Sequence, residues 1–284
     1  MGVVELRQIQ SIVRPTTPSE AWSLRTAQPE ATRFLGGGVD LVLYTPETVT
    51  TLIDLSGLGQ RGVRAGRGGV TIGAATTLSE LLEAPPIASY AGGVVVDVLR
   101  HVGSPLQRNL ATVGGAAARA HPWSDVVLAL LVLDAEIEVF NGTPRSVPVA
   151  EFYAARPRDV APLITGIRLP QRSTTVRGAY EKFGRTGFDV ALLNCACVAD
   201  AVRGTASDVR IAVGGTPSLA RRLPEAEAAL EGKPWSSARI AEAASVAARV
   251  VQARDDRRAS ESYRRTLTEV GVRRCLARLA GEDA

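Results

Sequence analysis

The sequence is poor in cysteine and histidine. Its 284 residues include only three cysteines and two histidines. The cysteines are Cys195, Cys197 and Cys275, whereas an iron–sulfur cluster usually takes four cysteine ligands. We expect Cys195 and Cys197 in the core, within a strand and with one of them on each side of it. The histidines, His101 and His121, are isolated, so the sequence predicts no metal site.

Long hydrophobic runs and clusters of basic residues are also missing. No apolar run approaches the roughly 20 residues needed to cross a bilayer, and residues 1–7 (MGVVELR) lack the basic region and apolar core of a secretory signal. The net charge of +4 comes almost wholly from arginines, since lysine occurs only at Lys182 and Lys233. No basic stripe is interleaved with aromatic residues. These absences predict a cytoplasmic protein without a membrane span and without nucleic acid as a partner.

Glycine, in contrast, is concentrated in two segments. Residues 33–41 read RFLGGGVDL, so three consecutive glycines follow a short apolar run that is typical of a strand. Glycine has no Cβ and reaches positive φ freely, which suits a tight turn whose backbone approaches another group closely. Successive N–H groups in such a turn can bind an anion, above all a phosphate. Taken alone, a cluster of this kind is more often a plain turn.

The second segment makes the phosphate interpretation stronger. Residues 103–116 read GSPLQRNLATVGGA, which we interpret as a second glycine loop. Thr112 comes just before Gly114 and Gly115, and its hydroxyl can donate to a phosphate oxygen. One such loop suits one phosphate, whereas two facing loops suit the pyrophosphate at the centre of a dinucleotide.

The two segments resemble the paired FAD-pyrophosphate motifs of the FAD-binding (medium) subunits of molybdenum hydroxylases. That family includes the medium subunit of carbon monoxide dehydrogenase and the FAD domain of xanthine dehydrogenase. Its members carry AGGx(D/S)L, then RNxAT(I/V)GGN, then PxSD. This chain has GGGVDL at 36–41, RNLATVGGA at 108–116 and PWSD at 122–125. One departure is Ala116 in place of asparagine, which removes a side-chain hydrogen bond and is expected to weaken flavin binding by about 1 kcal/mol.

The resemblance implies FAD as the cofactor and also implies which residues bind it. Asp125 is expected to bond hydroxyls of the FAD chain, although Ser124 or Asp125 could instead cap the following helix. Asp40 has the same two alternatives, and the main chain at 164–167 is expected to contact the flavin ring. No catalytic residue or metal ligand is implied in this chain. The implied cofactor-binding residues are Phe34, Leu35, Gly36, Gly37, Gly38, Val39, Asp40, Leu41, Val102, Thr112, Val113, Gly114, Gly115, Ala116, Asp125, Ile167 and Lys182.

The expected fold class is α+β. The resemblance implies a FAD-binding domain of the PCMH/vanillyl-alcohol-oxidase type over residues 1–172, with subdomains at about 1–56 and 57–172. Capping boxes predict helices that begin after Thr17 and Thr77. Residues 57–69 read as loops, and 126–133 as a buried helix or a short connector. Further helices are expected at 40–44 and 90–102, and strands at 33–35, 51–55, 70–74, 135–140, 146–149 and 163–170.

The pattern changes near the polar stretch 171–175, after which residues 176–284 form the expected C-terminal domain. Strands are expected at 177–185, 190–202 and 208–214, followed by helices at 225–231, 237–253 and around 263–270. Strands followed by helices imply an antiparallel sheet with helices on one face. Residues 260–265 (SESYRR) also resemble a segment of the family's small C-terminal domain, so the resemblance covers nearly the whole chain.

Three functions remain open on the sequence alone. The leading one is a FAD-binding electron-transfer subunit, an oxidoreductase subunit active only in complex. The resemblance implies a partner with two 2Fe–2S clusters and a large molybdenum-cofactor subunit, assembled as a heterotrimer or a dimer of heterotrimers. Electrons would pass from the clusters to FAD and on to an external acceptor. The alternatives are a structural subunit that has lost flavin and a nicotinamide-dependent dehydrogenase, although 36–38 lacks G-x-G-x-x-G spacing.

Overall fold

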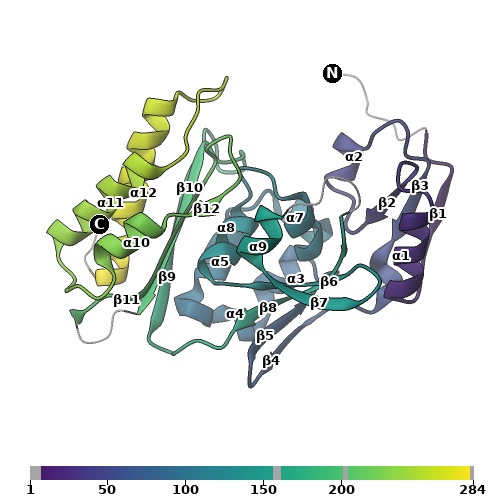
Figure 1. Cartoon of the computed structure of the whole chain (residues 1–284), viewed down its shortest axis with the longest axis horizontal. Helices are drawn as coiled ribbons and strands as arrows, with labels where there is room; N and C mark the ends of the chain where they lie inside the picture. The colour runs from purple at the N-terminus through teal and green to yellow at the C-terminus, as the bar shows by residue number, and fades with distance from the viewer. Residues whose placement is uncertain (1–7, 156–160, 201–203, 282–284) are drawn as a thin grey trace. The chain divides into compact units, whose positions relative to one another are not determined.

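The computed structural model describes residues 8–155, 161–200 and 204–281, and the chain divides into two compact units (Figure 1). The first unit contains Met1–Leu81, Ser104–Arg119 and Glu136–Leu169. The second unit contains Leu82–Gly103, Ala120–Ala135 and Pro170–Ala284. Two segments that precede the polar stretch at 171–175 therefore pack with the C-terminal region. The expected boundaries at 172 and 176 remain a prediction.

A small parallel sheet begins the first unit. Its order is β1 (Ser11–Val13), β3 (Thr51–Asp54) and β2 (Thr32–Leu35), and helix α1 (Pro18–Ala27) packs on it. The Thr17 side chain caps α1, as predicted, by accepting from the N–H of Glu20. The Glu20 carboxylate completes a variant of the capping box, because it accepts from the N–H of Thr16 and not from that of Thr17. This sheet places the first glycine segment directly after β2.

A five-stranded sheet in the order β4-β5-β8-β6-β7 forms the rest of the first unit's framework. The expectation of loops throughout 57–69 is wrong, because part of that stretch pairs with β5 as a hairpin strand. The second capping box is confirmed, since Thr77 and Glu80 each accept from the other's backbone N–H. The strands are β4 (Val63–Gly66), β5 (Gly69–Gly73), β6 (Glu136–Phe140), β7 (Pro144–Pro148) and β8 (Leu163–Pro170), and the short helices are η1 (Leu55–Leu58), α2 (Leu41–Tyr44), α3 (Leu78–Glu83), α6 (Pro105–Leu110), α7 (Val113–Arg119) and α9 (Val149–Ala154).

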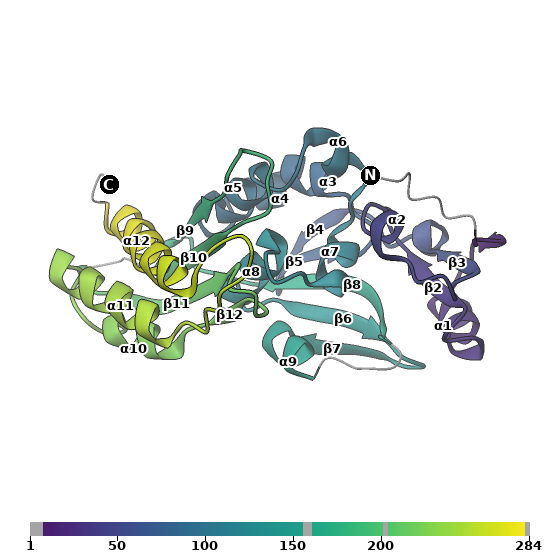
Figure 2. The same ribbon diagram turned by 90° about the horizontal axis from the view of Figure 1, so that it is seen from above.

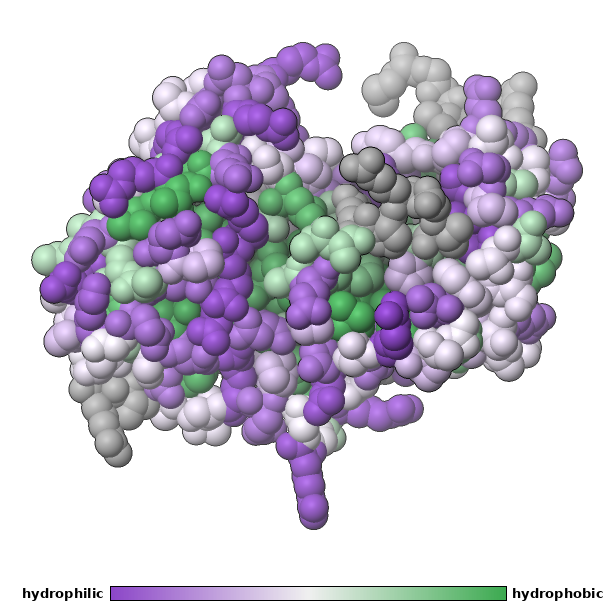
Figure 3. Space-filling model, viewed as in Figure 1, coloured by the Kyte–Doolittle hydropathy of each residue, from purple (hydrophilic) through white to green (hydrophobic). Residues whose placement is uncertain are grey.

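The second unit is built on an antiparallel sheet in the order β12-β11-β10-β9, and Figure 2 shows helices α10–α12 side by side along it. The helices pack through small and aliphatic side chains, and Figure 3 shows hydrophilic residues among hydrophobic ones where these helices face solvent. The strands expected at 177–185, 190–202 and 208–214 and the three helices expected after them are present with shifted bounds, and residues 201 and 202 lie outside the described residues. The helix expected over 90–102 is confirmed only from Val94 to Arg100, because residues 90–93 form a separate turn with non-helical backbone. The bounds of the sheet strands and of the helices after them are β9 (Val176–Phe183), β10 (Leu193–Asp200), β11 (Ser207–Gly214), β12 (Arg221–Arg222), α10 (Pro224–Leu230), α11 (Ser237–Val250) and α12 (Glu261–Ala280).

Helices cover both faces of this sheet. Helix α8 (Asp125–Val132) packs against β10 and β11, and α5 (Val94–Arg100) packs against β9. Strand β10 is therefore buried along both faces from Leu193 to Ala199. The expectation of helices on one face holds for α10–α12 but missed the contribution of the earlier segments. Two further short elements, α4 (Pro85–Ala88) and η2 (Tyr90–Gly93), precede α5 in the second unit.

The cysteines lie together on the α12 side of the sheet. Residues i and i+2 of a strand point to the same face, so Cys195 and Cys197 both pack in the core that α12 forms with β10. The expectation of one cysteine on each side was wrong for this reason. Cys275 on α12 completes the group, with its Sγ 4.0 Å from that of Cys195. Burial raises the pKa of the Cys197 thiol, which suits a core residue.

The SESYRR segment has a structural explanation. Ser260 caps α12 by accepting from the N–H of Tyr263. Arg264 is 1% exposed, and its guanidinium donates to four oxygens, among them Leu192 O and Asp256 Oδ1. Arg265 donates to two carbonyls near the C-terminal end of α11. The two arginines thus satisfy backbone acceptors that these helix and loop ends would otherwise leave unpaired.

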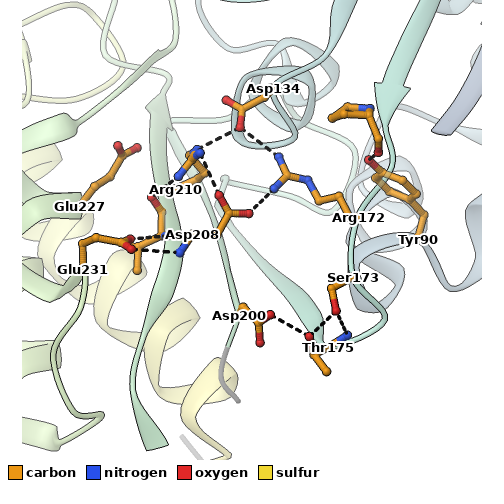
Figure 4. A network of polar contacts seen from close by, with 12 residues as sticks. Tyr90, Asp134, Arg172, Ser173, Thr175, Asp200, Asp208, Arg210, Glu227 and Glu231 are labelled. Atoms are coloured by element: carbon orange, nitrogen blue, oxygen red, sulfur yellow. Dashed lines mark hydrogen bonds and ion pairs between the residues drawn. The ribbon is translucent and has the colours of Figure 1, made fainter. Parts of the chain in front are cut away.

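The polar stretch at 171–175 is anchored within the second unit (Figure 4). The buried Arg172 side chain pairs with Asp208 and, at 3.0 Å, with Asp134 Oδ2. Asp134 also receives Arg210 and Arg222, at 2.9 and 2.6 Å. Charges of opposite sign alternate through this network, so each partly buried charged group is paired with an opposite charge. The stretch where the sequence pattern changes is therefore a fixed part of the second unit.

Candidate functional site

The first glycine segment forms a turn between β2 and α2 in the first unit. Gly38 has φ +73°, the left-handed conformation that favours glycine. The backbone N–H groups of residues 36–39 donate to no acceptor in the part of the chain that the structure describes. A run of unpaired N–H groups in a turn is suited to an anion. The segment therefore has the donors that the sequence predicted for it.

Only glycine fits at the first two glycine positions of this segment, because the second segment lies against them. A Cβ on Gly36 would lie 2.8 Å from Thr112 Oγ1, and a Cβ on Gly37 would lie 1.7 Å from the carbonyl oxygen of Leu110. Both distances are shorter than real Cβ contacts. The two segments thus lie directly against each other, as the expectation of facing segments requires.

The second segment is helical, so its interpretation as a loop was wrong. Helix α6 covers Pro105–Leu110 and α7 begins at Val113. The N–H groups of Val113 and Gly114 donate to the carbonyls of Thr76 and Ala74, and that of Gly115 donates to Thr112 Oγ1. Gly114 is needed for packing, since a Cβ there would lie 2.8 Å from the Ala74 oxygen. In this segment the Thr112 hydroxyl proton, not the glycine N–H groups, is the donor available to a phosphate.

Asp40 is engaged by an arginine that lies three residues after the second segment. It occupies the N-cap position of α2, but its side chain makes no capping hydrogen bond. Instead, its Oδ2 lies 2.5 Å from Nε of Arg119, the last residue of α7. The structure thus excludes side-chain capping, one of the two roles considered for Asp40. It adds Arg119, which the sequence analysis did not single out.

Asp125 is the centre of a buried polar cluster in the second unit. Ser124 caps α8, because its Oγ accepts from the N–H of Val127, and Asp125 is the first helical residue. The Asp125 carboxylate accepts from Tyr180 Oη at 2.7 Å, from Asn194 Nδ2 at 2.5 Å and from Lys182 Nζ at 3.1 Å. The capping alternative for Asp125 is therefore wrong, since Ser124 fills that role.

The sheet register explains this cluster. Lys182 is the partner of Asn194 and Tyr180 is the partner of Ala196 across β9 and β10, so the polar side chains share the face that packs on α8. Lys182 also donates to the carbonyl oxygen of His101 at 2.7 Å. Burial and the nearby Asp125 carboxylate raise the pKa of the Tyr180 phenol, which therefore stays a hydrogen-bond donor at neutral pH.

Sequence reasoning missed Tyr180 and Asn194. The signal for Asn194 was present, since it is a polar residue within an apolar strand and is fully buried. Buried amides are usually hydrogen-bonded, so a partner could have been expected. Tyr180 is two residues from Lys182, which places both side chains on one face of a strand.

The structure distributes the predicted cofactor-binding residues between the two units. The first unit holds residues 34–41, residues 112–116 and Ile167, whose side chain is fully buried on β8. The second unit holds Val102, Asp125 and Lys182. The Lys182 bond to His101 places Lys182 beside the segment that contains Val102. Each group is thus assembled within its own unit, and the assignment of all of them to a cofactor remains a prediction.

Two further findings limit the chemistry of the described residues. Among residues 8–155, 161–200 and 204–281, no group of three or more histidine, cysteine, aspartate or glutamate residues could hold a metal ion. No helix within those ranges has the length and apolar character of a membrane span.

Comparison with known families covers nearly the whole chain. Residues 7–172 match the FAD-binding domain in molybdopterin dehydrogenase, and residues 178–279 match the CO dehydrogenase flavoprotein C-terminal domain. The first match alone covers more than half of the 284 residues.

Individual relatives agree with these matches. The chain is 28% identical to the nicotine 6-hydroxylase medium subunit of Paenarthrobacter nicotinovorans, covering 87% of this chain and 89% of that protein. It is 25% identical to a putative xanthine dehydrogenase FAD-binding subunit of Escherichia coli, covering 95% and 97%. Among solved structures, it matches a chain of carbon monoxide dehydrogenase from Hydrogenophaga pseudoflava with a TM-score of 0.89 and 26% identity, covering 97% and 99%. The chain therefore belongs to the family of FAD-binding medium subunits of molybdenum hydroxylases.

Proposed function

We propose that this chain is the electron-transfer subunit of a cytoplasmic molybdenum hydroxylase. In this proposal it binds FAD, receives electrons from 2Fe–2S clusters of a partner subunit and passes them to an external acceptor. A large subunit with the molybdenum cofactor would oxidise the substrate, in a heterotrimer or a dimer of heterotrimers. The relatives named medium or FAD-binding subunits support an assembly of this kind.

The observation that best supports FAD binding is the first glycine segment. Its N–H groups at 36–39 are unpaired in the described chain, and its backbone lies against the residue that offers the Thr112 hydroxyl. These groups would hold the pyrophosphate, and FAD when bound supplies the redox chemistry.

The buried Asp125–Lys182 pair is the second element of the proposal. Its two side chains are each 7% exposed, and Tyr180 and Asn194 fix the carboxylate from the sheet side. Groups held this firmly can position a ligand without reorganising when it binds. We propose that Asp125 accepts from hydroxyls of the FAD chain and that Lys182 lies near the flavin.

Two measurements on the full chain test this function. The purified chain should show the absorption bands of an oxidised flavin, or regain them when FAD is added. A tagged chain should co-purify with subunits that contain iron, sulfide and molybdenum, and substrate oxidation should appear only in that complex. Absence of flavin binding would favour the structural-subunit alternative. Substrate oxidation by the single chain with metals shown to be absent would contradict the proposed division of labour.

A further inference from the structure

Arg119 occupies a special position relative to the two glycine segments. It ends α7, a helix whose first turn contains Gly114 and Gly115 of the second segment. Its Nε lies 2.5 Å from Asp40 Oδ2, and its Cζ lies 4.8 Å from the centroid of the Tyr44 ring. A single guanidinium thus forms an ion pair and a cation–π contact with two residues of another element.

Those two residues lie at opposite ends of α2, which follows the first glycine segment. Asp40 immediately precedes α2 and Tyr44 is its last residue. With only four residues, α2 has little intrinsic stability, because a single helical turn does not repay the cost of nucleation. The Asp40 side chain does not cap it. Contacts from outside α2 must therefore hold it in place, and Arg119 contacts both of its ends.

We propose that Arg119 is a positioning residue for dinucleotide binding. By fastening α2 to α7, it keeps the N–H groups of residues 36–39 in register with the Thr112 hydroxyl. It also offsets the negative charge of Asp40, which would otherwise oppose an incoming phosphate. This inference rests on the proposed FAD function and adds a residue and a role to it.

The geometry predicts a specific effect on ligand selection. FAD carries two phosphates and can use donors from both segments, whereas FMN carries one phosphate. Loosening the attachment of α2 should therefore weaken FAD binding more than FMN binding. Global stability should change little, since the Arg119 and Asp40 side chains are 45% and 35% exposed and ion pairs at such exposure contribute weakly.

The test uses the full chain freed of flavin, with Arg119→Gln, Asp40→Asn, the double variant and Arg119→Lys. Kd for FAD and for FMN is measured by flavin fluorescence, and unfolding by thermal melting. Arg119→Gln is expected to weaken FAD binding by about 5- to 20-fold, the scale of an exposed ion pair plus a cation–π contact, and to weaken FMN binding less. The double variant should be no weaker than Arg119→Gln alone, and Arg119→Lys should recover part of the loss.

Arg239→Gln is the matched control, because Arg239 is 46% exposed and pairs with Glu242 on α11. It should leave both Kd values unchanged.

Two outcomes would overturn the positioning role. One is an equal loss of affinity for FAD and for FMN. The other is a double variant whose loss of FAD affinity is the sum of the losses in Arg119→Gln and Asp40→Asn. Hydrogen exchange of residues 36–44 in the flavin-free protein separates the two proposals. If the wild type binds no FAD, the proposed function fails, whereas unchanged exchange in Arg119→Gln refutes the attachment itself.

Discussion

Replacing Gly37 with alanine perturbs the contact between the two glycine segments directly. The new Cβ would lie 1.7 Å from the Leu110 oxygen and 2.5 Å from its carbonyl carbon. Real Cβ atoms keep at least about 3.0 Å from such atoms, so the backbones must separate by at least 1.3 Å, the difference between 3.0 and 1.7 Å. The neighbouring atoms belong to the main chain, so no side chain can move aside to make room.

The cost to stability should be moderate and the cost to FAD binding larger. Overpacking of this kind costs about 1–3 kcal/mol, and alanine regains roughly 0.4–1 kcal/mol by restricting the unfolded chain. The net loss is therefore about 0–2.6 kcal/mol, which corresponds to a fall in Tm of at most roughly 10 °C. Losing even one hydrogen bond to a charged phosphate costs about 1.5–3 kcal/mol, which is roughly 10- to 150-fold in Kd.

The assay compares Gly37→Ala with Gly66→Ala. Gly66 lies in β4 of the same unit, and a Cβ there would meet no atom within 4 Å. Flavin-free protein is melted to obtain Tm and then titrated with FAD to obtain Kd. The control should bind FAD normally. If Gly37→Ala lowers Tm but binds FAD as tightly as the wild type, the close contact between the segments serves the fold and not the cofactor.

Two more predictions concern charged groups. Asp125→Asn should lower the free energy of unfolding by about 3 kcal/mol, because it leaves the buried Lys182 without its counter-charge, and it should also weaken FAD binding; a Kd equal to that of the wild type would assign Asp125 a structural role only. The Arg61 guanidinium lowers the pKa of the Glu80 carboxyl, so the stability from this group is complete above its ordinary pKa of 4.5 and is lost as the pH falls through the lowered value. Glu80→Gln should therefore flatten the dependence of Tm on pH below about 4.5. If Tm of this variant falls with pH as it does in the wild type, the ion pair with Arg61 does not contribute to stability.

The strands and long helices could be predicted because their signals are local. The alternation at 135–140 predicted β6, and the apolar periodicity at 237–253 predicted α11. The capping box at Thr77 likewise depends on residues three positions apart, and the structure contains it. In these places the hydrogen bonds and the buried faces depend on neighbours in sequence.

The second glycine segment could not be predicted in this way. Glycine disfavours helix interiors, yet α7 contains Gly114 and Gly115 because carbonyls of Thr76 and Ala74 accept from its first N–H groups. Those partners lie more than 30 residues away in the sequence. Helix α6 is different, because its capping box of Ser104 and Gln107, with Pro105 at the first helical position, is visible in the sequence although the sequence analysis did not predict this helix.

The Asp125 cluster shows the same limit at the candidate site. The motif pointed to Asp125, but its partners come from β9 and β10, more than 50 residues further along the chain. Only the sheet register places Tyr180, Lys182 and Asn194 on one face. A single sequence does not reveal which strands pair, so the residues that hold a motif in place are harder to predict than the motif itself.

Ala116, where the family usually has asparagine, offers a gain-of-function test. It lies at the middle of α7 and is partly exposed, so a longer side chain has room. Asparagine costs about 0.5 kcal/mol of helix propensity relative to alanine but adds an amide that can donate to the cofactor. Ala116→Asn should lower Tm slightly and tighten FAD binding by about 1 kcal/mol, the value of one hydrogen bond. Ala118→Asn is the control, because it lies two residues on in the same helix and is exposed, so it carries the same propensity cost on a different face. If both variants change Kd alike, residue 116 does not face the cofactor, and the placement of FAD along α7 must be revised.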